Sequence, residues 1–280
     1  MKIGILADWL NQGSLEGNLR KAAEMGADGV QLYAVDGELA PENMTCEKRK
    51  ALRKLVSDLG LEISALCGDM GEGGFAFEEQ NPLRIRRTKA IVDLALDLGC
   101  RIVTTHVGVV PHDPQHPRFA VIARAMKELG DYAESKGAVF AIETGPEPSA
   151  DLKRLIELTG SRGIGVNMDP ANLIMCHNEP ATQAVETLKK YIVHTHAKDG
   201  RLLKHGSMDE MYGMVPVPPD YDDSEYCVEL PLGEGDVNFD TYIPALKAAG
   251  YDGYLTIERE CGADPVHDIG LAIDFLKKYL

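Results

Sequence analysis

Residues 139–143 read Val-Phe-Ala-Ile-Glu, a short apolar run that stops on a carboxylate. The same form recurs as Ile-Gly-Val-Asn-Met-Asp at 164–169, Tyr-Ile-Val-His-Thr-His at 191–196 and Tyr-Leu-Thr-Ile-Glu at 254–258. Burying an acid or an imidazole is costly unless the group is paired or bound to a cation. Four strands that each end in such a group therefore predict that these ends converge at one edge of one sheet.

The rest of the chain alternates short apolar runs with segments of helical period, which indicates repeated βα units and a parallel sheet. We expect eight strands, near residues 3–7, 29–33, 61–66, 101–106, 138–143, 163–169, 191–196 and 253–258. Helices are expected near residues 15–25, 47–59, 83–98, 117–136, 150–160, 181–190, 239–249 and 265–279. Eight units in 280 residues favour an α/β fold of the closed (β/α)8 TIM-barrel type, with residues 1–280 as a single domain.

A glycine follows the expected end of several helices, directly before the next strand. Glycine adopts the left-handed conformation of a helix C-terminus without strain. This order of helix, glycine and strand is typical of a repeating β/α array, and it occurs at Gly26, Gly60, Gly99, Gly137, Gly160 and Gly250.

One connection is much longer than the others and occupies about 200–236, between the strand ending at His196 and the helix near 239. Loops of this length inside compact domains are usually lids or binding loops. Loops that follow barrel strands leave the face that carries the active site. We therefore expect an active-site lid; an oligomer contact or a disordered surface excursion are the alternatives, and assembly into a homo-oligomer is left open.

The composition limits the classes of partner and compartment. A formal net charge of -15 argues against nucleic acid as a partner, because such partners require Lys/Arg surfaces. The six cysteines show no zinc-binding spacing, and free thiols are typical of a reducing cytosol. No stretch is long and apolar enough to span a membrane, and the first residues lack the pattern of a signal peptide. We expect a cytoplasmic protein without a membrane partner.

The strand ends on the C-terminal face of a TIM barrel build its active site. Four consecutive expected strands place a potential ligand there, so these residues should share one arc: Glu143, Asp169, His196 and Glu258. Three carboxylates and one imidazole suit a single divalent ion, with Mn²⁺, Mg²⁺ or Co²⁺ preferred and Zn²⁺ also compatible. The alternative is that each is a solvated loop residue or a helix cap. His194 lies one layer below His196 and is expected to support it.

Other side chains on this face are candidates for substrate binding. His106 ends the neighbouring strand and is a candidate substrate contact or ligand of a second metal. Trp9, the only tryptophan, follows the first strand and could stack on a sugar ring or pack at the rim. Lys198 and Arg201 could bind hydroxyls or a phosphate. Because no glycine-rich phosphate loop is present, the sequence leaves open whether the substrate carries a phosphate.

Between about 138 and 260 the chain contains the segments AIETGPE, VNMDPANL, HTHAKDG and LGEGDVNFDTYIPALKAAGYDGYLTIERE. These segments resemble the sugar phosphate isomerase/epimerase family of xylose isomerase-like TIM barrels, alongside ketose 3-epimerases and inosose dehydratases. The resemblance implies one divalent ion on the four strand-end residues, with Glu143 and Glu258 also acting as the acid/base pair. It also implies substrate-binding roles at Asn172, which stands where the family has a histidine, and at Arg201, near the family's arginine.

The chemistry of the residues points to the same pair, because Glu143 and Glu258 are the longer acids and flank the arc. One would remove a hydrogen from the carbon next to a carbonyl and the other would return one, through an enediolate stabilised by the metal. We therefore expect a divalent-metal-dependent isomerase or epimerase of a small carbohydrate: a sugar, sugar phosphate or related polyol. The alternative is a lyase or dehydratase that eliminates a group from the same enediolate. A non-catalytic sugar-binding barrel is a third reading, which two opposed bases disfavour.

Overall fold

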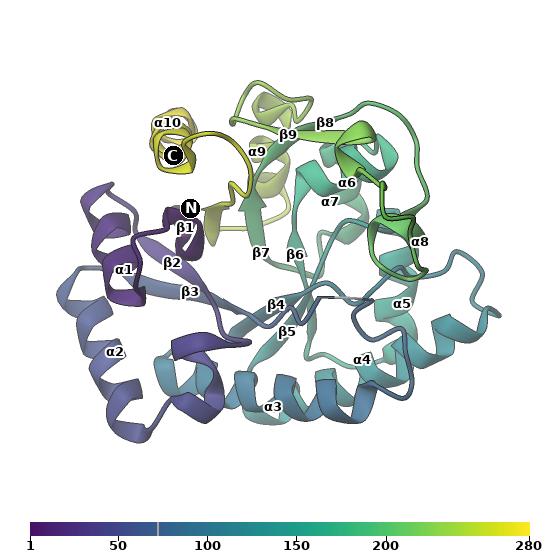
Figure 1. The fold of residues 1–280 in the computed structure, drawn as a ribbon, viewed down its shortest axis with the longest axis horizontal. Coiled ribbons are helices and arrows are strands. Elements are labelled where there is room, and N and C mark those ends of the chain that lie inside the picture. Colours follow the sequence, from purple (N-terminus) through teal and green to yellow (C-terminus); the bar gives the residue numbers. More distant parts are fainter. Residues whose placement is uncertain (72) are drawn as a thin grey trace.

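Eight short strands rich in Ile, Val and Leu pair in parallel and close a barrel (Figure 1). The structure, a computed structural model, describes residues 1–71 and 73–280. Around the barrel the order is β1-β10-β7-β6-β5-β4-β3-β2, which confirms the predicted (β/α)8 fold. The barrel strands are β1 (Lys2–Leu6), β2 (Gly29–Tyr33), β3 (Glu62–Cys67), β4 (Ile102–Thr105), β5 (Val139–Glu143), β6 (Ile164–Met168), β7 (Ile192–Ala197) and β10 (Tyr254–Ile257).

Helices cover the outside of the barrel and connect consecutive strands (Figure 1). All six glycines predicted to end helices have positive φ values, between 63° and 87°. The helices that alternate with barrel strands are α1 (Leu15–Glu24), α2 (Cys46–Asp58), α3 (Asn81–Leu98), α4 (Pro117–Lys136), α5 (Ser149–Thr159), α7 (Ala181–Leu188), α9 (Phe239–Ala248) and α10 (Pro265–Leu276).

Each of these helices buries one apolar face against the barrel, as α4 shows. Phe119, Ile122, Met126 and Leu129 recur every three or four residues and are all buried. That spacing places them on one side of the helix, where burial stabilises the fold by roughly 1.5–3 kcal/mol per large side chain. Within the described ranges, no helix is long and apolar enough to cross a membrane.

The structure also contains elements that the strand and helix pattern does not predict. The first is α6 (Pro170–His177), which begins directly after β6 because Asp169 caps it and Pro170 occupies its first turn. The others are short 3-10 turns in the loops after β1 and β2: η1 (Ala7–Leu10), η2 (Gly37–Leu39) and η3 (Pro41–Asn43). The helix predicted at 265–279 ends in a further 3-10 turn, η5 (Lys277–Tyr279), which follows α10.

The long connection at 200–236 has structure of its own. Its β8 (Asp199–Leu202) pairs antiparallel with β9 (Cys227–Leu230) (Figure 1), and α8 (Met208–Met211) and η4 (Asp223–Glu225) follow between the two strands in sequence. Arg118 of α4 donates to both carboxylate oxygens of Asp209, at 2.6 and 3.2 Å. The ring of Tyr212 packs edge-on against His106, with centroids 5.5 Å apart. This segment therefore covers part of the barrel mouth, and its role as a lid remains a prediction.

Asp199 ties the two ends of this segment together. Its buried carboxylate accepts four backbone hydrogen bonds at 2.9–3.0 Å, one from Gly200 and three from the returning loop, at Gly233, Gly235 and Val237. A Cβ at Gly235 would lie 2.1 Å from Oδ1 of Asp199, so only glycine allows this approach. Asp199 of the segment HTHAKDG and Gly235 of the segment LGEGDV therefore have a structural role at the base of the long connection.

Candidate metal centre

Four side chains from the carboxyl ends of β5, β6, β7 and β10 converge at the barrel mouth. All are buried, and one potential ligand atom of each lies within 4.8 Å of the others: Glu143, Asp169, His196 and Glu258. The parallel register produces this convergence, since Glu143 is level with Asn167 on β6, and His196 is level with Thr256 on β10. The structure thus brings together the four residues that the strand ends predict.

Two buried atoms of this cluster have no hydrogen-bond partner among the residues that the structure describes: Oδ2 of Asp169 and Nδ1 of His196. Asp169 uses its other oxygen, Oδ1, to accept two backbone hydrogen bonds at the start of α6, at 2.8 and 3.0 Å. One oxygen each of Glu143, Asp169 and Glu258 lies 3.1–3.5 Å from Nδ1 of His196, but none has hydrogen-bond geometry. Asp169 is therefore both a helix cap and a candidate ligand, and a bound ion would satisfy both unpaired atoms.

Gln31, in the middle of β2, fixes the orientation of the His196 ring. Its Oε1 lies 2.9 Å from Nε2 of His196, while its own Nε2 donates to the hydroxyl of Thr104 at 2.9 Å. An amide oxygen can only accept, so Nε2 of the ring carries a proton, and Nδ1, which faces the carboxylates, is the nitrogen left to bind an ion. Asn167 Nδ2 is also 3.1 Å from Nε2, and it donates to Glu143 at 3.0 Å. Histidines that bind metals are commonly oriented by such a second hydrogen bond.

Replacing Gln31 by Leu is expected to weaken metal binding by roughly 10- to 100-fold, the usual effect of losing a group that orients a ligand histidine. Leucine fills a similar volume but accepts no hydrogen bond, so His196 no longer has one fixed tautomer. Gln31→Glu keeps an acceptor oxygen and should retain more of the affinity. Calorimetric titration of Mn²⁺ into the three proteins measures the difference. Equal affinity of Gln31→Leu and the parent would show that Gln31 does not orient the ring.

The charges of the cluster favour a cation at its centre. Burial disfavours the protonated form of His196, yet the carboxylates of Glu258 and Glu143 outweigh it and raise the pKa of the imidazole well above its usual value. Burial also disfavours ionised Glu258, but the positive charges of His196 and Lys198 hold its pKa well below the usual range. Ionised oxygen donors with one imidazole nitrogen are the ligands of Mn²⁺, Mg²⁺ and related ions. These residues therefore fit a divalent metal ion.

The two glutamates differ in their hydrogen-bond partners. Glu143 accepts hydrogen bonds from two neutral side-chain amides. Asn167 donates to Oε2 at 3.0 Å, and Asn172 donates to Oε1 at 3.3 Å. Glu258 accepts at Oε2 from the buried Nζ of Lys198, at 3.1 Å, and the same ammonium binds Glu260 at 3.0 Å. Asn172 and Lys198, both predicted to bind substrate, are thus also bound to predicted metal ligands.

A layer of polar side chains lies beneath the cluster, inside the barrel. Nδ1 of His194 is 2.9 Å from Oδ1 of Asn167, and its Nε2 faces the hydroxyls of Ser64 and Thr256, at 3.3 and 3.1 Å. Burial, with the nearby charge of His196, lowers the pKa of His194 well below its usual value, so the ring is neutral. Because the Asn167 oxygen accepts, the proton is on Nδ1. His194 lies one layer below the cluster, as expected from its spacing.

His106 lies at the edge of the cluster, with Nε2 3.5 Å from Oε1 of Glu143. Burial disfavours its charged form, but the carboxylates of Glu143, Asp69 and Glu147 raise its pKa above the usual value. Glu147 is itself buried without a hydrogen-bond partner in the described part of the chain, and burial raises its pKa to about 8. Glu147 follows Glu143 in its loop, and from the sequence it is a weaker candidate for a substrate contact. Asp69 is not among the residues predicted to form the site, because its position in a loop, outside the strand ends, gave no pattern to detect.

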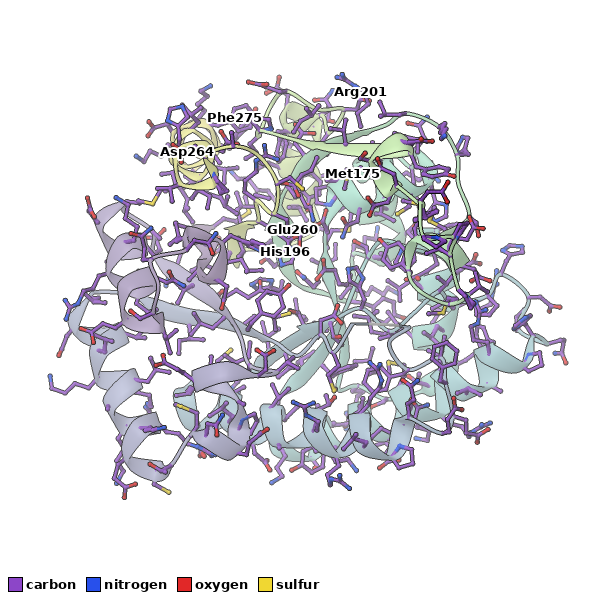
Figure 2. The ribbon with its side chains drawn as sticks, in the orientation of Figure 1. Met175, His196, Arg201, Glu260, Asp264 and Phe275 are labelled. Atoms are coloured by element: carbon purple, nitrogen blue, oxygen red, sulfur yellow. The ribbon has the colours of Figure 1, made fainter. Side chains whose placement is uncertain are left out.

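Of two other residues predicted to contact substrate, Trp9 lies at the barrel mouth and Arg201 does not. Trp9, in η1, lines an open cavity at the mouth. Arg201, in contrast, is 45% exposed on β8 and binds the surface carboxylate of Asp236 at 2.9 Å. Figure 2 shows it near the top of the view, away from His196 and Glu260 at the centre. Pairing of β8 with β9 directs Arg201 to solvent, so the structure does not bring it together with the cluster.

Fold and site together define a class of protein: a closed parallel α/β barrel with a buried carboxylate–histidine centre at the C-terminal ends of its strands. Such a centre is where TIM-barrel enzymes carry out their chemistry. Residues 19–279 match the model of a family described as the xylose isomerase-like TIM barrel. The chain belongs to this family.

Proteins with named activities are similar to the chain at low identity. A 2-epi-5-epi-valiolone 7-phosphate 2-epimerase of Actinoplanes sp. is 26% identical over 210 residues, covering 70% of this chain and 72% of the relative. An inosose dehydratase of Lacticaseibacillus casei is 24% identical over 175 residues, covering 57% and 52%. The crystal structure of a xylose isomerase domain protein from Planctomyces limnophilus has a TM-score of 0.77 at 26% identity, covering 93% and 90%. Both epimerases and dehydratases are therefore among the similar proteins.

Proposed function

We propose that the protein is a divalent-metal-dependent isomerase or epimerase of a sugar or related polyol. The observation that carries the proposal is the buried cluster in which Asp169 Oδ2 and His196 Nδ1 are unpaired while two glutamates flank them. A site of this composition has no evident structural use, because unpaired buried groups destabilise a fold. Membership of the xylose isomerase-like family and the named epimerase relative support the same chemistry.

In this proposal the residues at the centre have different roles: metal binding, proton transfer and exclusion of water. The four cluster residues would hold a divalent ion, which when bound would supply a Lewis acid to polarise a substrate carbonyl. Lys198 occupies Oε2 of Glu258, which leaves Oε1 available to take a proton from carbon or to return one. Glu143, at the other end of the arc, serves the opposite face of the same carbon or the adjacent carbon. Tyr212 and the long connection reduce access of water to the reacting carbon.

Solvent exchange tests this proposal directly. Metal-loaded protein in D₂O, incubated with a panel of ketoses and inososes, should place deuterium on the carbon next to the carbonyl of at least one compound. The carbon skeleton and all hydroxyl groups should be retained, since isomerisation and epimerisation only move hydrogen. Proton NMR follows the exchange, and protein treated with a chelator provides the control. Absence of exchange across the panel by protein with bound metal would reject the proposed chemistry.

A lyase remains the second candidate, because one specific feature favours it. His106, whose pKa is raised, lies beside Glu143 at 3.5 Å and could protonate a departing hydroxyl group. An inosose dehydratase is also among the named relatives. The same NMR experiment separates the two reactions, since a lyase consumes the substrate with loss of water or another group.

A further inference from the structure

The barrel mouth opens onto two adjoining cavities. The larger has a volume of about 610 Å³, and its walls include Asp8, Trp9, Tyr33, Asp36, Asp69 and Glu260. The smaller, of about 310 Å³, is lined by His106, Tyr212 and several glycines, and Asp69 belongs to both walls. Ligand sites in proteins typically span 300–1,000 Å³. Each cavity alone reaches that range, so together they offer space for a substrate larger than one ring.

The larger cavity adjoins the metal centre through one ammonium group. Glu260 lines the cavity, and Nζ of Lys198 binds Glu260 at 3.0 Å and the candidate ligand Glu258 at 3.1 Å. Figure 2 shows Glu260 and His196 in the same central region of the mouth. On the other side, the smaller cavity reaches the centre through His106, 3.5 Å from Glu143. The centre is therefore separated from the larger cavity by the Lys198–Glu260 pair and from the smaller cavity by His106.

The walls of the larger cavity have the chemistry of a sugar site. Trp9 and Tyr33 provide aromatic rings for the apolar face of a sugar, and the carboxylates provide acceptors for its hydroxyl groups.

The charge of the larger cavity's walls disfavours an anionic group in that cavity. The described residues that line the two cavities include no Lys or Arg. The nearby ammonium of Lys198 is already bound to Glu258 and Glu260. A phosphate or carboxylate in the larger cavity would face Asp8, Asp36, Asp69 and Glu260 without a free cation. One relative is named for a phosphorylated substrate, so the fold alone does not decide this property.

We propose that the larger cavity is a subsite for a second, uncharged sugar or polyol ring, so that the substrate is a glycoside and not a sugar phosphate. The reacting ring then occupies the space beside Glu143 and His106, while the second ring packs on Trp9 and Tyr33. The proposal rests on the metal-dependent sugar chemistry proposed above for the neighbouring centre.

The only tryptophan of the chain, Trp9, reports on this cavity directly. Protein in Mg²⁺ buffer is titrated with sucrose, trehalose, maltose and cellobiose, with glucose, and with glucose 6-phosphate, while tryptophan emission is recorded. At least one disaccharide should saturate the emission change with an affinity roughly tenfold or more above that of glucose or its phosphate. The subsite is overturned if no disaccharide changes the emission, or if glucose 6-phosphate binds most tightly.

Two matched variants identify the cavity as the source of the selectivity. Asp36 is exposed, and although it is the N-cap residue of η2 its side chain makes no capping hydrogen bond, so Asp36→Asn removes one wall carboxylate without disturbing a hydrogen bond of that turn. This variant should weaken disaccharide binding. The ratio of the affinities for the disaccharide and for glucose 6-phosphate should fall several-fold relative to the parent protein. Glu38→Gln removes the same charge two residues away, from the wall of a different cavity, and should leave both affinities unchanged. Equal effects of the two variants would show that net charge, and not this cavity, sets the selectivity.

The outcomes also separate the subsite from the proposed reaction. Saturable disaccharide binding without deuterium exchange on any keto-sugar or keto-glycoside rejects the chemistry and leaves the subsite intact. Exchange on single-ring substrates without a preference for two rings rejects the subsite and leaves the chemistry intact.

Discussion

Replacing Glu143 or Glu258 by Gln is expected to abolish turnover while some metal is still bound. Glutamine offers a carbonyl oxygen to an ion but cannot take up and return a proton, so the loss of the base should cost on the order of 10² to 10⁴ in rate. Turnover and metal content measured on the same preparations separate the two effects. The two variants should also differ from each other, because Glu143 is bound by neutral amides and Glu258 by the ammonium of Lys198. If each glutamate transfers a proton at one face of the reacting carbon, the remaining glutamate can still act in each variant. One of the two variants should then exchange the substrate hydrogen with solvent without forming product.

Asp169→Asn is the matched comparison for these variants. Asparagine keeps the oxygen that caps α6, and it is a good capping residue, so the local fold should be preserved. The variant loses only the charge that Oδ2 directs at the centre, and its defect should be reversed in part by excess metal. If excess metal restores Glu143→Gln and Glu258→Gln equally well, the glutamates act as ligands only and the proton-transfer assignment is wrong.

Asp199→Ala is expected to lower the free energy of unfolding by about 3–5 kcal/mol, because four backbone N–H groups lose a buried acceptor. The effect should be concentrated in the long connection, since Asp199 joins its two ends. Urea denaturation measures the total loss, and hydrogen exchange shows whether amides of residues 200–237 lose protection first.

Asp236→Asn controls for the loss of a carboxylate in the same region. Asp236 is 44% exposed and pairs with exposed Arg201, and surface pairs of this kind contribute about 0–1 kcal/mol. The variant should therefore unfold almost like the parent protein. Similar unfolding free energies for Asp199→Ala and Asp236→Asn would show that the four hydrogen bonds contribute little.

The barrel strands and the four converging residues could be predicted from sequence because each has a local signature. An apolar run that ends in an acid or imidazole, as at Glu143 or Glu258, is recognisable without any knowledge of its neighbours. The helix ends were equally local, since glycine is nearly obligatory at a left-handed C-terminus such as Gly99 or Gly137.

The parts that escaped prediction depend on contacts between distant residues. Gln31 meets His196 across 165 positions of sequence, and only its unusual place inside an apolar strand pointed to it. The strands β8 and β9 are four residues each, and β9 carries the acid Glu229, whose side chain is only 5% exposed, so neither shows a clear period. Arg201 was predicted to bind substrate because it follows His196 at nearly the spacing of the family's arginine. The direction of its side chain is set instead by the pairing of β8 with β9.

The polar layer beneath the centre links the site to the assembly of the fold. His194 on β7 finds its partners on β3, β6 and β10, at Ser64, Asn167 and Thr256. These groups meet only when strands far apart in sequence have closed into a ring. A half-formed barrel would leave them buried and unpaired, at about 1–3 kcal/mol for each group. The side chains that support the metal ligands thus make closure of the ring cooperative, and partly folded states are penalised by the same residues that the finished site requires.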